Sequence, residues 1–158
     1  MSAPNKKFMK AAVSAAAEGL RLGKGGPFGA IVVKDGKIIA TGCNHVTSTN
    51  DPTAHAEVMA IREACRVLGT YQLTDCEIYT SCEPCPMCLG AIYWARPKKV
   101  YFASTRHDAA AAGFDDSFIY DELNVDADKR TIPLIRLEEE DAAALFKLWN
   151  SSDSKKEY

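Results

Sequence analysis

Residues 28–43 read FGAIVVKDGKIIATGC, two short apolar runs separated by an Asp-Gly pair. Such a pair between apolar runs is typical of a two-residue hairpin turn, because both turn positions need a positive φ. We therefore predict two antiparallel strands over residues 28–33 and 37–43, joined by a turn at Asp35 and Gly36. The rest of the fold is expected to assemble around this hairpin.

Helical patterns lie on both sides of the hairpin. Residues 5–22 place apolar side chains at the three-and-four spacing of one buried helical face. The triplet Asp-Pro-Thr at residues 51–53 offers capping oxygens and a proline at a helix start, and an apolar stripe then runs to Leu68 before Gly69. We predict helices over residues 5–22 and from residue 51 to about residue 68.

Strands and helices continue to alternate in the remainder of the chain. The pattern predicts strands over residues 77–81, 99–103 and 134–137, helices over 86–94 and 138–149, and a helical turn or two over 109–121. This alternation favours an α/β fold in which helices cover a mixed sheet. The last eight residues, SSDSKKEY, are predicted to be a tail, and a single domain is expected over residues 1–158.

Composition narrows the class of protein. The chain has 158 residues, of which 47% are apolar and 25% are charged, as expected for one soluble globular domain. No stretch approaches the roughly 18 apolar residues of a membrane span, and the first residues lack the apolar core of a secretory signal. We therefore expect a cytoplasmic protein, in which six cysteines serve as buried hydrophobes, metal ligands or nucleophiles rather than as disulfides.

Charge is distributed unevenly along the chain. Residues 1–107 carry 13 Lys or Arg and 8 Asp or Glu, whereas residues 108–158 carry 6 and 13. The basic residues are dispersed, without the interleaved aromatics of a nucleic-acid groove, and the last third is acidic. This pattern argues against a nucleic-acid partner and favours a small-molecule substrate.

Two segments together indicate a catalytic zinc site. One is HAE at residues 55–57 and the other is PCPMC at residues 84–88, each at the start of a predicted helix. Catalytic zinc commonly takes three protein ligands and leaves a fourth position for water, and His55, Cys85 and Cys88 supply three. The two cysteines are three residues apart at a helix start, where one turn can direct both sulfurs to one ion and the helix dipole stabilises thiolates.

Glu57 is the predicted general acid and base of this site. It follows His55 by two residues, so it need not bind the metal but can reach a water activated there. The combination of His-x-Glu with Pro-Cys-x-x-Cys is the known signature of zinc deaminases that act on nucleobases.

The cysteine motif also allows other interpretations. Cys82 extends it to Cys-x-x-Cys-x-x-Cys, which would suit a structural zinc or an iron–sulfur cluster. Such a site would have to recruit a distant ligand, because no second cysteine pair follows downstream. Cys65 and Cys76 are expected to pack in the core, and Cys43 has no assigned role.

With these residues in place, the chain resembles the cytidine deaminase superfamily over nearly its whole length. The zinc motifs within residues 50–57 and 80–96, and the segment at residues 25–30, carry this resemblance. Within the superfamily the chain is most similar to the bacterial members that act on guanine, because of AGFDDSFIY at residues 112–120 and the terminal Tyr158.

The resemblance implies a fold, a reaction and an assembly. The fold would be a three-layer α/β/α sandwich around a five-stranded mixed sheet, with one zinc ion per chain. The reaction would be hydrolysis of guanine to xanthine and ammonia, in which a water activated at the metal gives its proton to Glu57 and attacks carbon 2 of the base. The protein would be a homodimer that exchanges its C-terminal tail, residues 151–158, so that Tyr158 reaches the neighbouring subunit's site.

The resemblance also implies a set of substrate-binding residues. Guanine carries adjacent ring N–H and amino donors that an ionised Asp116 can accept together, whereas adenine has no such pair. Asp116 could instead cap a helical turn at Ser117, and Phe28 and Trp94 could be core residues. The residues implied to surround the base are Asn44, Asp116, Phe28, which would stack on the ring, Ala56, Trp94 and Tyr158.

Other functions share parts of this pattern. A tRNA adenosine deaminase has the same zinc motifs but needs a basic surface for its polyanionic substrate. A guanosine or cytosine deaminase remains possible, since tolerance for ribose or a smaller ring cannot be judged from one sequence. A non-enzymatic zinc-binding interaction domain would have four protein ligands and no role for Glu57.

Overall fold

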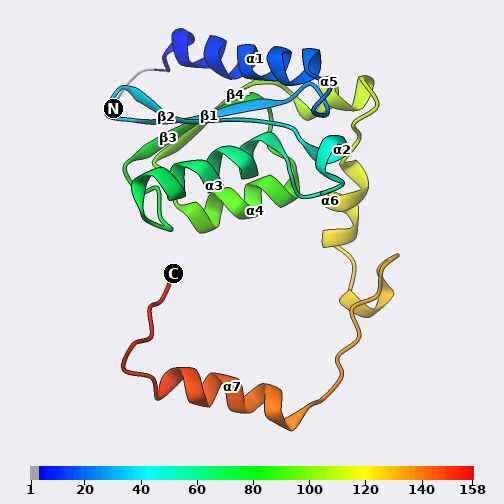
Figure 1. Ribbon diagram of the computed structural model, residues 1–158. Coiled ribbons are helices and arrows are strands. Elements are labelled where there is room, and N and C mark those ends of the chain that lie inside the picture. Colours follow the sequence, from blue (N-terminus) through cyan, green and yellow to red (C-terminus); the bar gives the residue numbers. More distant parts are fainter. Residues whose placement is uncertain (1–3) are drawn as a thin grey trace. The chain divides into compact units, whose positions relative to one another are not determined.

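The computed structural model describes residues 4–158, which form two compact units (Figure 1). The first ends at Asp116 and contains the sheet and the helices that cover it, and the second covers Ser117–Tyr158. No helix in the described part of the chain is both long enough and apolar enough to cross a bilayer.

The predicted hairpin is confirmed. Strand β1 covers Gly29–Lys34 and strand β2 covers Lys37–Cys43, and the two pair antiparallel. Both turn residues adopt positive φ, 49° at Asp35 and 72° at Gly36, as a tight hairpin of this kind requires.

The hairpin belongs to a four-stranded mixed sheet. Strand β3, Cys76–Cys82, runs antiparallel to β1, and strand β4, Lys99–Ser104, runs parallel to β3, so that the order is β2-β1-β3-β4. The parallel pair is connected through helix α4, Pro86–Ala95, in the way a parallel crossover requires. The strands predicted at residues 77–81 and 99–103 are thus confirmed, each slightly longer than expected.

The expectation of a fifth strand is wrong for the described residues. Residues 134–137 form no ladder, and the backbone N–H of Leu134 donates instead to the carbonyl of Ala127 at 2.8 Å. An alternating apolar run becomes a strand only when a neighbouring edge supplies its hydrogen bonds, and the second unit contains no strand that could do so.

Within the first unit, helices cover both faces of the sheet. Helix α1, Lys6–Arg21, lies on one face, and helix α3, Ala56–Leu68, lies with α4 on the other (Figure 1). The strands bury alternate residues on the two faces: Ile31 and Tyr79 pack with Ala12 of α1, whereas Val32 and Ile78 pack among the alanines of α3. This arrangement gives the three layers that the resemblance implied.

Glycine allows α3 to approach the sheet closely. A Cβ at Gly42 of β2 would collide with the backbone carbonyl of Ala56, the first residue of α3. Any larger residue here would push the start of α3 away from the sheet, and the start of α3 carries the HAE motif.

The start of α3 differs from the prediction. The helix begins at Ala56 rather than near residue 51, and Asp51 accepts hydrogen bonds from the backbone and hydroxyl of Thr53 at 2.8 and 2.7 Å. The Asp-Pro-Thr triplet therefore builds a tight turn before the helix instead of capping it. The C-terminal end is as predicted, with Gly69 at a φ of 63°.

The remaining helices are short. Helix α2, Val46–Thr49, was not expected from its polar sequence, and the helical turns expected over residues 109–121 appear as α5, Arg106–Ala111, and α6, Ser117–Leu123. The second unit continues with a 3-10 turn, Ala127–Lys129, and helix α7, Glu140–Asn150, close to the predicted helix over 138–149.

Candidate catalytic metal centre

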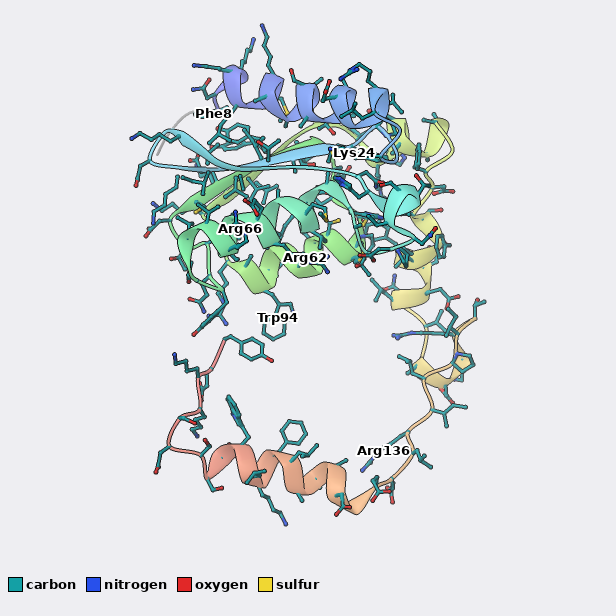
Figure 2. All side chains as sticks on the ribbon, in the orientation of Figure 1. Phe8, Lys24, Arg62, Arg66, Trp94 and Arg136 are labelled. Carbon is teal, nitrogen blue, oxygen red and sulfur yellow. The ribbon has the colours of Figure 1, made fainter. Side chains whose placement is uncertain are left out.

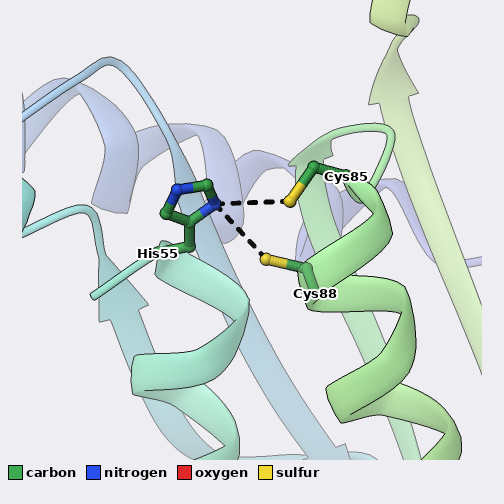
Figure 3. A group of neighbouring side chains, drawn as sticks. All are labelled: His55, Cys85 and Cys88. Atoms are coloured by element: carbon green, nitrogen blue, oxygen red, sulfur yellow. Dashed lines mark hydrogen bonds between the residues drawn. The ribbon is translucent and has the colours of Figure 1, made fainter. Parts of the chain in front are cut away.

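Two helix starts bring three potential metal ligands together. His55 directly precedes α3 and Cys85 directly precedes α4, both in extended conformation, and Cys88 lies in the first turn of α4 behind Pro86. His55 Nδ1 is 3.5 Å from Cys85 Sγ and 3.5 Å from Cys88 Sγ (Figure 3). The structure therefore assembles the three side chains that the sequence pattern singled out.

The spacing of these atoms fits a tetrahedral zinc ion. Zinc binds imidazole nitrogen at about 2.0 Å and thiolate sulfur at about 2.3 Å, so a tetrahedral nitrogen–sulfur edge is about 3.5 Å long. Among the described residues, His55, Cys85 and Cys88 form a group of three whose candidate ligand atoms all lie within 4.8 Å of one another. A three-ligand nitrogen and sulfur set is the type found in catalytic zinc sites, which keep one position for water.

Cys82 does not join this group. Its thiol is directed at the backbone carbonyl of Thr105, 3.6 Å away, and burial raises the pKa of that thiol. The extended Cys-x-x-Cys-x-x-Cys motif is therefore not gathered around one point. Cys76 is buried in the core and Cys65 packs against it, as expected.

The pKa values of the three side chains are shifted in different directions. The hydrogen bond from Cys88 and the nearby His55 ring lower the pKa of Cys85 to about 4, whereas the same hydrogen bond and burial raise the pKa of Cys88. The Cys85 thiolate in turn raises the pKa of His55. These shifts favour the thiolate at Cys85 and the thiol at Cys88, and a bound dication would favour the thiolate at both.

Glu57 is a buried carboxyl next to this group. Only 6% of the residue is exposed, and burial raises the pKa of its side chain. Its Oε2 lies 3.4 Å from Cys88 Sγ, and its Oε1 accepts a hydrogen bond of 3.3 Å from the hydroxyl of Thr80. A carboxyl whose pKa is raised by burial is suited to take up and release a proton near neutral pH.

Asn44 lies at the end of β2 with a fixed orientation. It is 6% exposed, and its Oδ1 accepts hydrogen bonds from the backbone N–H groups of Gly26 and Val46 at 3.2 and 3.1 Å. A Cβ at Gly25 would collide with this oxygen, so the glycine makes room for it. Because Oδ1 is occupied, the amide nitrogen is the part of Asn44 that can serve a ligand, as a donor.

Phe28 and Asp116 are both half-buried in the first unit. The ring of Phe28 meets the ring of Phe114 edge to face, with centroids 4.9 Å apart at 87°. Burial raises the pKa of Asp116, and the negative charge of Cys85 raises it further. The Asp116 carboxyl therefore interacts electrostatically with the group around His55. Sequence reasoning did not single out Phe114, although it lies in the segment that suggested guanine.

The other three candidates lie in different settings. Ala56 is fully buried in the core, so only its backbone could face a substrate. Trp94 is 62% exposed and projects from α4, eight residues or about 12 Å of helix beyond Pro86 (Figure 2). Tyr158 is exposed in the second unit.

Comparison with known proteins defines the class. Residues 2–104 match the family model of the cytidine and deoxycytidylate deaminase zinc-binding region, and the chain belongs to this family. It is 60% identical to a guanine deaminase of Bacillus subtilis over 154 residues, 98% of this chain and 99% of that relative. A crystal structure of a Bacillus subtilis guanine deaminase superposes with a TM-score of 0.95 over 99% of both chains.

More distant relatives share only part of the chain. A tRNA-specific adenosine deaminase of Aquifex aeolicus is 46% identical over 97 residues, which is 61% of this chain and 64% of that relative. The structure of a guanine deaminase from Nitrosomonas europaea gives a TM-score of 0.68 at 32% identity, over 73% of this chain and 67% of that chain. Of these relatives, the Bacillus subtilis guanine deaminase is similar over nearly the whole chain, including residues after 104.

Proposed function

We propose that this protein catalyses the zinc-dependent hydrolysis of guanine to xanthine and ammonia. The observation that carries this proposal is the buried Glu57 carboxyl beside the three-donor group of His55, Cys85 and Cys88. The similarity to a guanine deaminase over 98% of the chain supports guanine as the substrate, because the tRNA-specific adenosine deaminase of Aquifex aeolicus matches only 61% of the chain.

One zinc ion per chain would be held by His55, Cys85 and Cys88. When bound, zinc acts as a Lewis acid that lowers the pKa of a water molecule towards neutrality. Glu57, whose Oε2 lies on the side of these three residues, would take one proton from the attacking water and give it to ring nitrogen 3, and would then take the second proton of that water and give it to the leaving amine. The water oxygen ends on carbon 2, and the amino group leaves as ammonia, so atoms and charge balance.

The base would be recognised by groups of opposite hydrogen-bonding character. Asp116 accepts the adjacent ring N–H and amino donors of guanine, and the free amide nitrogen of Asn44 donates to an acceptor on the purine edge. Phe28, held edge to face by Phe114, stacks on the ring, and the backbone of Ala56 borders the site. Adenine would leave Asp116 without its donors, which disfavours it.

Replacement of Asp116 by Asn is expected to lower kcat/KM for guanine by about 10–100-fold, because charge-assisted hydrogen bonds contribute about 1.5–3 kcal/mol. Steady-state kinetics on guanine would measure the change. Asp115→Asn, which removes the same charge one residue earlier, is the control and should stay near wild type. Equal effects of the two substitutions would remove Asp116 from the site.

A substrate panel tests the proposed function itself. Zinc-loaded protein is incubated with guanine, guanosine, adenine, cytosine, cytidine and tRNA, and the products are separated by chromatography. We expect xanthine from guanine, with kcat/KM at least about tenfold above that for any other compound. Inosine in the tRNA, together with tight salt-sensitive tRNA binding, would favour the adenosine deaminase alternative instead.

We further propose that two copies exchange their C-terminal segments, so that Tyr158 and Trp94 contribute to a site completed by the neighbour. This proposal is supported by the surface of the second unit, where large apolar side chains are exposed. A protein that works as a single chain rarely leaves so many of them uncovered. Those exposed by 69% or more are Ile132, Ile135, Leu137, Phe146 and Leu148.

Deletion of residues 151–158 is expected to lower guanine turnover by about tenfold or more, if the tail completes a site. Joint refolding of the deleted protein with the Glu57→Gln variant should restore part of the activity. In a mixed dimer, one site would combine the intact Glu57 of the deleted subunit with the intact tail of the other subunit. Lys155→Ala serves as a control for changes in tail charge. Full activity of the deleted protein would contradict the exchange.

A further inference from the structure

Thr80 is a buried polar residue at the centre of the sheet. It lies on β3, is 1% exposed, and stands opposite Ala30 of β1 and Phe102 of β4. Residues two apart on a strand share a face, so Thr80 lies on the same face as Ile78, which packs against α3. A hydroxyl on this apolar face costs free energy unless it is hydrogen-bonded, and valine would fill the same space without that cost.

The hydroxyl of Thr80 has two partners, both near the active site. It donates towards the backbone carbonyl of Cys82 at 3.0 Å and towards Glu57 Oε1 at 3.3 Å. Glu57 is 23 residues away in sequence and is itself 6% exposed. The hydroxyl therefore links the central strand to Glu57, the carboxyl that moves protons in the proposed reaction.

The two oxygens of Glu57 face different neighbours. Oε1 meets Thr80, whereas Oε2 meets Cys88 Sγ at 3.4 Å, on the side of the metal-ligand group. The terminal torsion of a glutamate side chain is broad, with no strongly preferred angle. A hydrogen bond to one oxygen is therefore what restricts the orientation of the other.

We propose that Thr80 is a positioning residue, which holds Oε1 of Glu57 so that Oε2 faces the group of His55, Cys85 and Cys88. This inference rests on the proposed function, since it concerns the carboxyl that moves the proton in guanine hydrolysis. Small errors in the placement of such a group lower the rate without weakening substrate binding. Thr80 thus acts on kcat rather than on KM, although it does not touch the substrate.

A matched pair of variants separates positioning from packing. Thr80→Val removes the hydroxyl and keeps the branched shape, and Thr80→Ser keeps the hydroxyl and removes the methyl group. For Thr80→Val we expect kcat on guanine to fall about 10–100-fold, as for a lost hydrogen bond to a charged group, with KM changed less than about threefold. Zinc content and Tm should equal or exceed those of the wild type. Thr80→Ser should recover most of kcat while lowering Tm.

A packing role predicts the reverse order, with serine more damaging to kcat than valine, and that order would overturn the proposal. A wild-type kcat in Thr80→Val would also overturn the proposal.

Thr41→Val, at an exposed position on β2, is the control. In a Glu57→Gln background, Thr80→Val should change the residual rate less than about twofold, because the two residues act as one unit. The wild-type rate on guanine separately tests the proposed function, so failure of that function and failure of the Thr80 inference are distinguishable.

Discussion

Replacement of Glu57 by Gln is expected to lower kcat for guanine by about 10³–10⁴-fold and to leave the zinc content unchanged. Glutamine keeps the shape and the hydrogen bond from Thr80 but cannot take up a proton. The contact described between Glu57 and this group is the one with Cys88, and Glu57 is not one of the three candidate ligands, so we expect that its carboxylate is not needed to hold the metal. Single-turnover kinetics and metal analysis of the same preparation would measure both quantities.

The control for this substitution is on the same helix. Glu63→Gln, also on α3, alters a carboxylate that pairs with Arg66 at 2.6 Å on the surface, and it should retain wild-type kcat. Activity of Glu57→Gln within about tenfold of the wild type would contradict the assignment of Glu57 as the proton carrier. Loss of zinc from Glu57→Gln would instead indicate that the carboxylate binds the metal.

Replacement of Cys85 by Ala should have a comparably large effect, through a different cause. Only two of the three donors would remain, so we expect zinc occupancy to fall from about one ion per chain to nearly none, with loss of guanine turnover. In the presence of zinc, the thermal midpoint of Cys85→Ala should lie below that of the wild type, because a bound metal stabilises the folded state. Metal analysis after gel filtration and calorimetry would measure these changes.

Cys65→Ala is the matched control for Cys85→Ala. Cys65 is a half-buried cysteine of α3 that packs against the core and is not part of the ligand group. Its removal should lower stability slightly and leave zinc content intact. Tight binding of one zinc ion by Cys85→Ala would show that the ligand set has been assigned incorrectly.

Local signals in the sequence were sufficient for most of the first unit. The Asp35-Gly36 pair fixes a hairpin because only a few residue types tolerate its backbone angles, and Gly69 ends α3 for the same reason. The candidate metal-binding group could be predicted from its two motifs, because each of its residues lies within one turn of a helix start, although only the fold brings His55 to Cys85 from 30 residues away. For the hairpin and the end of α3, the determining interactions are between residues close in sequence.

Predictions failed where the outcome depends on distant partners or on competing local bonds. Residues 134–137 have the composition of a strand, but a strand needs an edge to pair with, and Leu134 bonds to Ala127 instead. Asp51 could cap a helix, yet its carboxylate is taken by Thr53. Thr80 gave no signal, because its partner Glu57 is brought to it only by the packing of α3 on the sheet.

The reaction that we propose for this centre is the addition of water to carbon 2 of guanine. The most direct test is to run the reaction with zinc-loaded protein in water enriched in oxygen-18 and to analyse the purine product by mass spectrometry, with ammonia measured in parallel. We expect xanthine that carries one oxygen-18 atom, formed in equal amount with ammonia. Unchanged guanine, or xanthine that forms without the label, would contradict it.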